Sequence, residues 1–290
     1  MTAPEVRIRT YIRSGLSFDV RDEGPLDGPV VVLLHGFPQD STSWDRLAPM
    51  LHARGYRTLA PDQRGYSPGA RPKWRWAYRG SELVADIVAL IDAAGLGTVH
   101  VVGHDWGAAV AWQIAAQRPD MLRTLTAVSV PHPLAFARAM LTSSQVVKSW
   151  YMAAFQLPIL PEWVLARTSL GHKALVASGQ KPDYAQRDLD AMRAPGRLRG
   201  GLNWYRALWM VKPDGRSTRI SVPTLHIWSD GDSAIGPNGA QLTPNFVDGP
   251  YRFEVLRGVS HWIPDEAPEE LDRLLAEHLR GDRYRPTPQS

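Results

Sequence analysis

The stretch Val-Val-Gly-His-Asp-Trp-Gly-Ala-Ala at residues 101–109 has the pattern of a strand, a tight turn and a helix, with Asp105 at the tip of the turn. The tip residue of such a turn is held in a strained conformation, so its neighbours must be small. Gly103, Gly107 and Ala108 meet this need, whereas an aspartate that only caps a helix requires no glycine on either side. The pattern therefore predicts that Asp105 presents its carboxylate as a nucleophile.

The other two members of a catalytic triad are expected further along the chain, in the order nucleophile, acid, histidine. Asp230 and Asp232 come after one predicted strand, and His261 comes after another. A histidine at this place and in this order predicts a general base, and an acid beside it would orient the ring. We expect Asp232 to be this acid, with Asp230 as the alternative.

The segment His35-Gly36-Phe37-Pro38 follows a strand of continuous apolar residues. In a strand–turn–helix architecture of this kind, the loop at this place donates one backbone N–H to an oxyanion hole, and the residue after the nucleophile donates the other. The backbone N–H groups of Phe37 and Trp106 are therefore the predicted donors.

Asp105 occupies the tip of the turn, where a serine would place a hydroxyl nucleophile, and this difference changes the reaction that the site can perform. With a reference pKa of about 3.9, its side chain is ionised at neutral pH and needs no base to activate it. It can displace a leaving group at a saturated carbon and form an alkyl-enzyme ester, which water activated by His261 would then hydrolyse. Epoxides and alkyl halides are the two substrate classes that fit, and an epoxide oxygen gains from a general acid such as tyrosine.

The elements that must position these residues alternate between strands and helices. Apolar runs bounded by turn residues predict strands, and amphipathic runs between them predict helices. This alternation favours a mostly parallel eight-stranded sheet with helices on both faces. The strands are expected at residues 6–13, 16–22, 29–36, 56–62, 98–105, 122–130, 223–230 and 251–258, and the helices at residues 44–55, 81–95, 106–119 and 267–281.

The alternation stops between about Pro131 and Pro223, where the sequence has helical patterns and prolines but no convincing strand. We interpret this stretch as a helical insertion over the carboxyl edge of the sheet. The predicted division is a core domain of residues 1–130 and 222–290 and a helical cap, or lid, of residues 131–221.

Five motifs together resemble the epoxide hydrolase family, of the bacterial soluble type, within the α/β-hydrolase superfamily; they are HGFPQDSTSW, PDQRGYS, GHDWGA, NWYR and SHWIPDEAPEEL. The resemblance covers essentially the whole chain and implies an α/β-hydrolase fold. It also implies that Asp105 is the nucleophile, His261 the base and Asp232 its partner. The implied activity is the addition of water to an epoxide, giving a vicinal diol without a cofactor.

The same resemblance implies two tyrosines on the lid as general acids. Tyr205 stands in the NWYR motif, whose tyrosine contacts the epoxide oxygen in the family, and Tyr151 lies four residues before a Phe-Gln pair. Tyr184 is a weaker alternative that matches no motif. The substrate pocket is expected to be lined by His35, Phe37, Trp106 and Trp262.

Three other functions fit the same fold less well. Haloalkane dehalogenases also carry a tryptophan after the nucleophile, as Trp106 does, but they typically have Asn where this chain has Phe37, so one halide donor would be missing. Fluoroacetate dehalogenases share HGFPQ but usually have arginine in place of Trp106. An inactive ligand-binding protein on the same fold would have no use for an Asp–His–Asp set.

The composition is that of an ordinary globular protein, with 290 residues of which 44% are hydrophobic and 21% charged. No apolar run is long enough to span a bilayer, and the amino end lacks the apolar core of a signal peptide, so we expect a cytoplasmic protein. Because the chain has no cysteine, disulfides and thiolate metal sites are excluded. The nine histidines show no zinc spacing, and no metal or cofactor is predicted.

The formal net charge is +4, and the densest basic stretch is residues 71–79, in which Lys and Arg alternate with aromatic residues. Such a stretch can bind nucleic acid, but no nucleic-acid-binding motif accompanies it, so we interpret it as a surface loop. The expected partners are a small-molecule epoxide and water, with the chain acting as a monomer or a homodimer.

Overall fold

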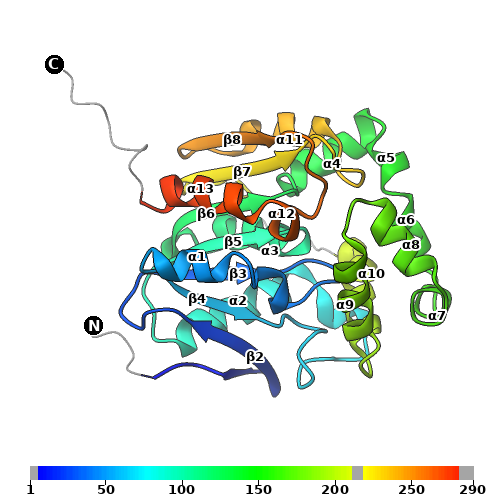
Figure 1. Cartoon of the computed structure of the whole chain (residues 1–290), viewed down its shortest axis with the longest axis horizontal. Coiled ribbons are helices and arrows are strands. Elements are labelled where there is room, and N and C mark those ends of the chain that lie inside the picture. The colour runs from blue at the N-terminus through cyan, green and yellow to red at the C-terminus, as the bar shows by residue number, and fades with distance from the viewer. Residues whose placement is uncertain (1–5, 211–217, 281–290) are drawn as a thin grey trace.

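Eight strands form one sheet through the centre of the molecule in the computed structural model, which describes residues 6–210 and 218–280 (Figure 1). Their order is β1-β2-β4-β3-β5-β6-β7-β8; β2 runs antiparallel to both its neighbours, and every pair from β4 to β8 is parallel. The predicted mostly parallel eight-stranded sheet is confirmed. The strands are β1 (Thr10–Arg13), β2 (Leu16–Glu23), β3 (Val30–Leu34), β4 (Arg57–Pro61), β5 (Val99–His104), β6 (Leu122–Val128), β7 (Thr224–Ser229) and β8 (Tyr251–Leu256).

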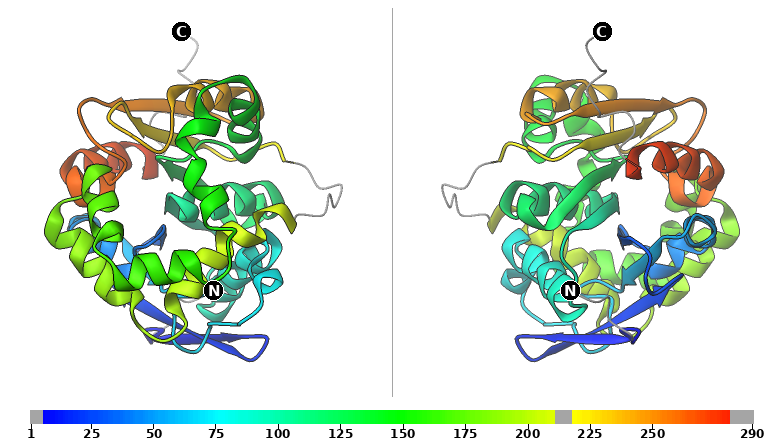
Figure 2. Two further views of the ribbon diagram at one scale, coloured as in Figure 1. Left: turned by 90° about the vertical axis from the view of Figure 1, so that its right-hand side faces the viewer. Right: turned by 90° about the vertical axis from the view of Figure 1, so that its left-hand side faces the viewer.

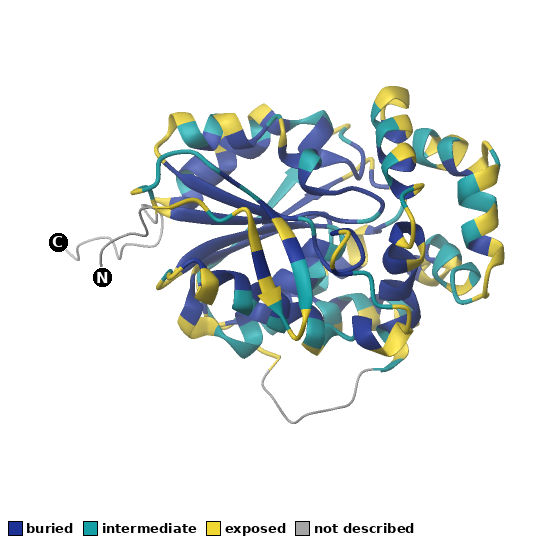
Figure 3. Ribbon diagram, turned by 90° about the horizontal axis from the view of Figure 1, so that it is seen from below, coloured by how far each residue is buried: buried dark blue, intermediate teal, exposed yellow. Residues whose placement is uncertain are grey.

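Helices cover the two faces of the sheet because successive side chains of the central strands point to opposite sides. In β3, Val32 and Leu34 join the apolar cluster that contains α2 (Gly80–Ala93) and α3 (Trp106–Gln117). Val31 and Leu33 join the other cluster, with α1 and α13. All five β3 side chains are buried, which explains the continuous apolar run, and Figure 3 shows the strands as the buried layer. The remaining core helices are α1 (Ala48–Ala53), α11 (Pro237–Leu242), α12 (Ile263–Glu266) and α13 (Pro268–Leu279).

The turn between β5 and α3 brings the backbone of three elements into close contact. Asp105 has φ 51° and ψ −120°, a region that a side-chain-bearing residue rarely adopts. A Cβ on Gly107 would lie 2.0 Å from the Leu34 carbonyl oxygen, and one on Gly103 would lie 2.3 Å from the Gly107 carbonyl oxygen. The small residues around Asp105 are therefore needed because the start of α3 packs directly against the end of β3.

Among the described residues between β6 and β7 there are seven α-helices, and most of them stand beyond one end of the sheet, at the right of Figure 1. The first, α4, packs against α11 of the core. The division of the chain at residues 131 and 221 stays a prediction. The helices are α4 (Pro133–Thr142), α5 (Gln145–Lys148), α6 (Trp150–Ala154), α7 (Leu160–Arg167), α8 (Leu170–Ala177), α9 (Pro182–Met192) and α10 (Arg197–Ala207).

Polar contacts fasten α9 and α10 to the core. The Trp204 indole of α10 donates a hydrogen bond to the Arg64 carbonyl oxygen at 2.8 Å. Arg187 of α9 contacts the Asp265 carboxylate at 3.3 Å. Each contact is buried or half-buried, so these helices have a fixed position over the sheet.

None of the described helices combines the length and the apolar character that crossing a bilayer would require.

The close approach at the turn makes a prediction about stability. Gly107→Ala should lower the free energy of unfolding by about 3 kcal/mol, because the added methyl group overlaps the Leu34 carbonyl and the strained turn must move. Gly97→Ala is the matched control, since nothing lies within 4 Å of its Cβ position. Urea unfolding followed by circular dichroism measures both variants, and equal midpoints for the two would contradict the packing argument.

Candidate active site

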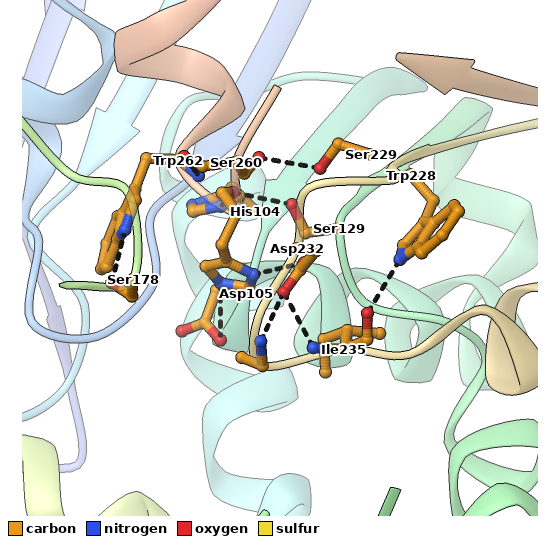
Figure 4. A network of polar contacts seen from close by, with 12 residues as sticks. His104, Asp105, Ser129, Ser178, Trp228, Ser229, Asp232, Ile235, Ser260 and Trp262 are labelled. Carbon is orange, nitrogen blue, oxygen red and sulfur yellow. Dashed lines mark hydrogen bonds and ion pairs between the residues drawn. The ribbon is translucent and has the colours of Figure 1, made fainter. Parts of the chain in front are cut away.

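The ends of β5, β7 and β8 bring an aspartate, a histidine and a second aspartate together (Figure 4). His261 Nδ1 lies 2.7 Å from Asp232 Oδ2, and His261 Nε2 lies 3.6 Å from Asp105 Oδ2. The other oxygen of Asp232 accepts hydrogen bonds from the backbone N–H groups of Ala234 and Ile235, both at 2.8 Å. The Asp232 carboxylate is thus held by three donors in a fully buried position and fixes the orientation of the His261 ring.

The alternative acid, Asp230, points elsewhere. Its carboxylate accepts a hydrogen bond from the Gly258 backbone N–H at 2.7 Å and lies 3.4 Å from the exposed guanidinium of Arg257. Of the two aspartates in this loop, the structure brings only Asp232 to His261.

The two oxygens of the Asp105 carboxylate have different surroundings. Oδ1 accepts a hydrogen bond from the Phe37 backbone N–H at 2.8 Å, while Oδ2 faces His261. A Cβ on Gly36 would lie 2.4 Å from the Asp105 Cβ, so the loop after β3 can reach the carboxylate only because residue 36 is glycine. The predicted donor Phe37 is therefore in place, and Trp106 is the first residue of α3, where backbone N–H groups have no partner within the helix.

Charge is concentrated in this buried cluster. Burial opposes the charged form of Asp105, but its interaction with His261 outweighs that effect and holds the pKa below the ordinary value. Burial would likewise lower the pKa of His261, but the carboxylates of Asp232 and Asp105 raise it to about 10. At neutral pH the free site accordingly holds an imidazolium between two carboxylates.

Two tyrosines from the helices beyond the sheet lie next to one another at this site. The rings of Tyr151 and Tyr205 are 6.0 Å apart, and Tyr205 also packs edge-on against Phe37 at 5.4 Å and Trp106 at 5.0 Å. Burial first, and the charge of Asp105 second, raise the pKa of both hydroxyl groups above the ordinary value. Both are protonated at neutral pH and able to donate. The weaker alternative Tyr184 lies on α9, where its ring packs under the Arg187 guanidinium at 4.8 Å.

The remaining predicted pocket residues, His35 and Trp262, have their polar atoms engaged in bracing the site. His35 Nδ1 lies 3.0 Å from the Gly36 carbonyl oxygen, and its Nε2 accepts a hydrogen bond from the Gln63 backbone N–H at 3.1 Å. The Trp262 indole donates to the Ser178 hydroxyl at 3.0 Å, which joins the loop of His261 to the segment after α8.

Sequence reasoning missed two residues that hold His261 from behind. Its backbone carbonyl oxygen accepts hydrogen bonds from His104 Nε2 at 2.9 Å and from the Ser129 hydroxyl at 3.0 Å (Figure 4). Burial, and then the nearby His261, lower the pKa of His104 to about 4, so its ring is neutral and donates through Nε2. Ser129 has φ 69°, and this unusual backbone conformation at the end of β6 accompanies the contact.

A cavity of about 520 Å³ lies beside α2, α3 and α10 and is not lined by Asp105. Trp106 borders it, and the same indole ring packs against Tyr205. None of Asp105, Asp232 and His261 lines this cavity, so the cavity is separate from the catalytic groups.

Comparisons with known proteins show the family to which the chain belongs. The family described as alpha/beta hydrolase fold matches residues 29–268. The chain is 36% identical to the AB hydrolase superfamily protein YfhM of Bacillus subtilis, over 92% of this chain and 96% of that protein. It is 32% identical to epoxide hydrolase A of Mycobacterium tuberculosis, over 97% of this chain and 99% of that protein.

Solved structures of epoxide hydrolases also resemble this chain. An epoxide hydrolase from metagenomes of hot environments superposes with a TM-score of 0.83 at 28% identity, covering 94% of this chain and 97% of its own. An epoxide hydrolase from an endophytic Streptomyces gives a TM-score of 0.79 at 30% identity, covering 95% and 96%. The chain therefore belongs to the α/β hydrolase fold family and, within it, to the epoxide hydrolase family.

The two aspartates of the β7 loop give a matched pair of variants. Asp232→Asn should reduce turnover by about 10³-fold or more, because the ring of His261 loses the charge that orients it and raises its pKa. Asp230→Asn, two residues away, should change turnover by less than about twofold, since its contacts are at the surface. Steady-state kinetics on purified, folded variants measures both; the reverse pattern would make Asp230 the acid.

Proposed function

We propose that this protein is an epoxide hydrolase that adds water to a small-molecule epoxide and releases a vicinal diol. The proposal is supported above all by the two environments of the Asp105 carboxylate, one oxygen held by the Phe37 N–H and the other facing His261. The helices of residues 131–221 act as a cap that supplies Tyr151 and Tyr205. The cytoplasmic location expected from the sequence stays a prediction.

In the first step, Asp105 Oδ2 attacks one epoxide carbon while the carbon–oxygen bond on that carbon breaks. The leaving oxygen takes a proton from Tyr151 or Tyr205, both of which are protonated at neutral pH. The product is a hydroxyalkyl ester on Asp105. Because the carboxylate is ionised and already oriented by Phe37, the step needs no general base.

The second step follows from the charge that the first step removes. Once Asp105 is an ester, His261 loses one of the two carboxylates that raise its pKa, and its proton can pass through water to the tyrosinate. Neutral His261 then takes a proton from water, which attacks the Asp105 carboxyl carbon. The oxyanion that forms at Oδ1 is stabilised by the Phe37 and Trp106 N–H groups. Its collapse breaks the bond between the carboxyl carbon and Oδ2, and the departing oxygen takes the proton from His261 to release the diol. The Asp105 carboxyl group then returns a proton to His261, which restores the starting charges.

The haloalkane dehalogenase alternative has less support. A departing halide needs side-chain donors in a dry site, and the residue at position 37 is a phenylalanine whose ring packs against Phe155 and Tyr205. The Trp106 indole would be left as one donor. An epoxide oxygen, by contrast, could take its proton from either of two tyrosines, whose ring centroids lie 6.0 Å apart.

The tyrosines can be tested as a pair. Tyr151→Phe and Tyr205→Phe should each reduce epoxide turnover by about 10- to 100-fold, and the double variant should lose nearly all of it, because one hydroxyl can partly replace the other. Tyr184→Phe is the control and should leave turnover unchanged. A folded double variant with the turnover of the original protein would show that the acid lies elsewhere.

The covalent step has its own test. His261→Gln should still form the ester but not hydrolyse it, so intact mass should increase by one substrate molecule, located on the peptide that contains Asp105. In a single turnover of the original protein in ¹⁸O-water, the label should enter the Asp105 carboxylate. An unmodified His261→Gln protein, together with immediate label in the diol, would rule out this mechanism.

A further inference from the structure

Exposed apolar side chains gather on the helices farthest from the core. Of fifteen large hydrophobic side chains that are exposed in the described part of the chain, nine lie within residues 141–170, from the end of α4 to the start of α8. Leu141, Val147, Trp150 and Ile159 are the most exposed of these, at 87%, 70%, 69% and 77%. We call the exposed side chains of residues 141–170 the outer cap surface. A large exposed apolar patch on a protein surface often marks a site of interaction with a membrane or with another protein.

The elements that carry this surface share one side of the molecule. Helix α5 contacts α4 and α6, and α7 contacts α8, with residues 155–159 joining α6 to α7. In the left view of Figure 2 these green helices run one after another across the face toward the viewer. The exposed side chains thus come from consecutive elements on one side of the molecule.

Ile159, between α6 and α7, has an unusual backbone conformation at the tip of a tight turn, across which the Leu160 N–H donates to the Pro158 carbonyl oxygen at 2.7 Å. Its φ is 67° and its ψ is −44°, in the left-handed half of the backbone map, where a β-branched side chain is strained. The same side chain is 77% exposed, so no packing in the protein compensates for the strain. With Leu157 and Leu160 also exposed, this connection presents an apolar tip to the surroundings.

The charged residues in and next to the outer cap surface in the sequence are mostly cations. Residues 138–173 contain four cations, Arg138, Lys148, Arg167 and Lys173, and one carboxylate, Glu162. Glu162 pairs with Arg206 of α10 at 2.7 Å, so its charge is neutralised within the protein. Arg138, Arg167 and Lys173 are exposed, and the described residues offer none of them an ion pair.

We propose that the outer cap surface docks on the anionic surface of a lipid bilayer, with the Leu157–Leu160 tip and the indoles of Trp150 and Trp163 in the headgroup region and the cations against lipid phosphates. Apolar side chains, exposed tryptophans and unpaired cations on one face are the features that such binding requires. A second copy of this chain fits less well, because a twofold contact would set these cations against one another without a free carboxylate.

The docked face adjoins the site. Trp150 precedes Tyr151 on the five-residue helix α6, so the indole at the bilayer and the ring beside Tyr205 come from one turn of helix. Binding would bring the helix that covers Asp105 against the lipid, where apolar epoxides concentrate. This consequence rests on the proposed function, whereas the docking itself does not.

The docking is measured by co-sedimentation of the full chain with vesicles of phosphatidylcholine containing half phosphatidylglycerol, and with vesicles of phosphatidylcholine alone. We expect binding to the anionic vesicles that is at least about tenfold stronger than to the neutral ones and that weakens in 0.5 M salt. The double variant Ile159→Asn/Trp163→Gln should lower binding about tenfold or more. Both replaced side chains are exposed, so this variant should fold as well as the original.

Trp76→Gln is the matched control, because Trp76 is 53% exposed on a different part of the chain, and it should bind as the original does. Turnover of a water-soluble epoxide should be the same in all variants, which separates a failure of docking from a failure of the proposed reaction. Equal loss in Trp76→Gln, or no binding to anionic vesicles, would overturn the proposal. So would a dimer in sedimentation equilibrium that the double variant converts to a monomer without any vesicle binding.

Discussion

The site depends on one close approach, in which the strained turn at Asp105 meets the loop after β3. The carboxylate accepts the Phe37 N–H at 2.8 Å, and the space for this contact exists because residues 36 and 107 are glycines. A backbone donor held by a sheet cannot adjust its position, so it orients the carboxylate before any substrate arrives. The parallel sheet is what brings the ends of β3 and β5 side by side.

The charge of His261 determines in which of the two proposed steps it can act as a base. His261 lies between two carboxylates, and its raised pKa makes it an acid partner in the free protein. Only the conversion of Asp105 to an ester would release it as a base. The order of events is therefore built into the electrostatics, because the group that activates water is inactive until the nucleophile has been used.

Most of the core could be predicted from the sequence because its burial follows simple periods. All eight strands were expected, and the four expected core helices are α1, α2, α3 and α13. The choice between Asp230 and Asp232 could not be made from spacing, since both lie in one loop and its turn decides which carboxylate faces His261. The roles of His104 and Ser129 could not be predicted from the sequence. Both donate hydrogen bonds to the His261 backbone carbonyl oxygen, and the position of a backbone atom cannot be inferred from a pattern of side-chain types.

The helices between β6 and β7 were harder to place for a related reason. Their exposed faces carry residues such as Val147, Trp150 and Ile159, so apolar character does not separate the inside from the outside there. An apolar pattern that would predict a buried helix in the core belongs here to helices with exposed apolar side chains.

Two consecutive residues of α10 join these helices to the chemistry. Trp204 and Tyr205 point about 100° apart around the helix axis. The first donates its indole N–H to the Arg64 carbonyl oxygen of the core, and the second lies with its ring against Phe37 and Trp106. A shift of α10 by even one residue would therefore lose both the anchor and the tyrosine. Phe37 and Trp106, the two predicted oxyanion-hole donors, both pack against Tyr205, so in the proposed mechanism the acid and the oxyanion hole are positioned by the same contacts between α10 and the core.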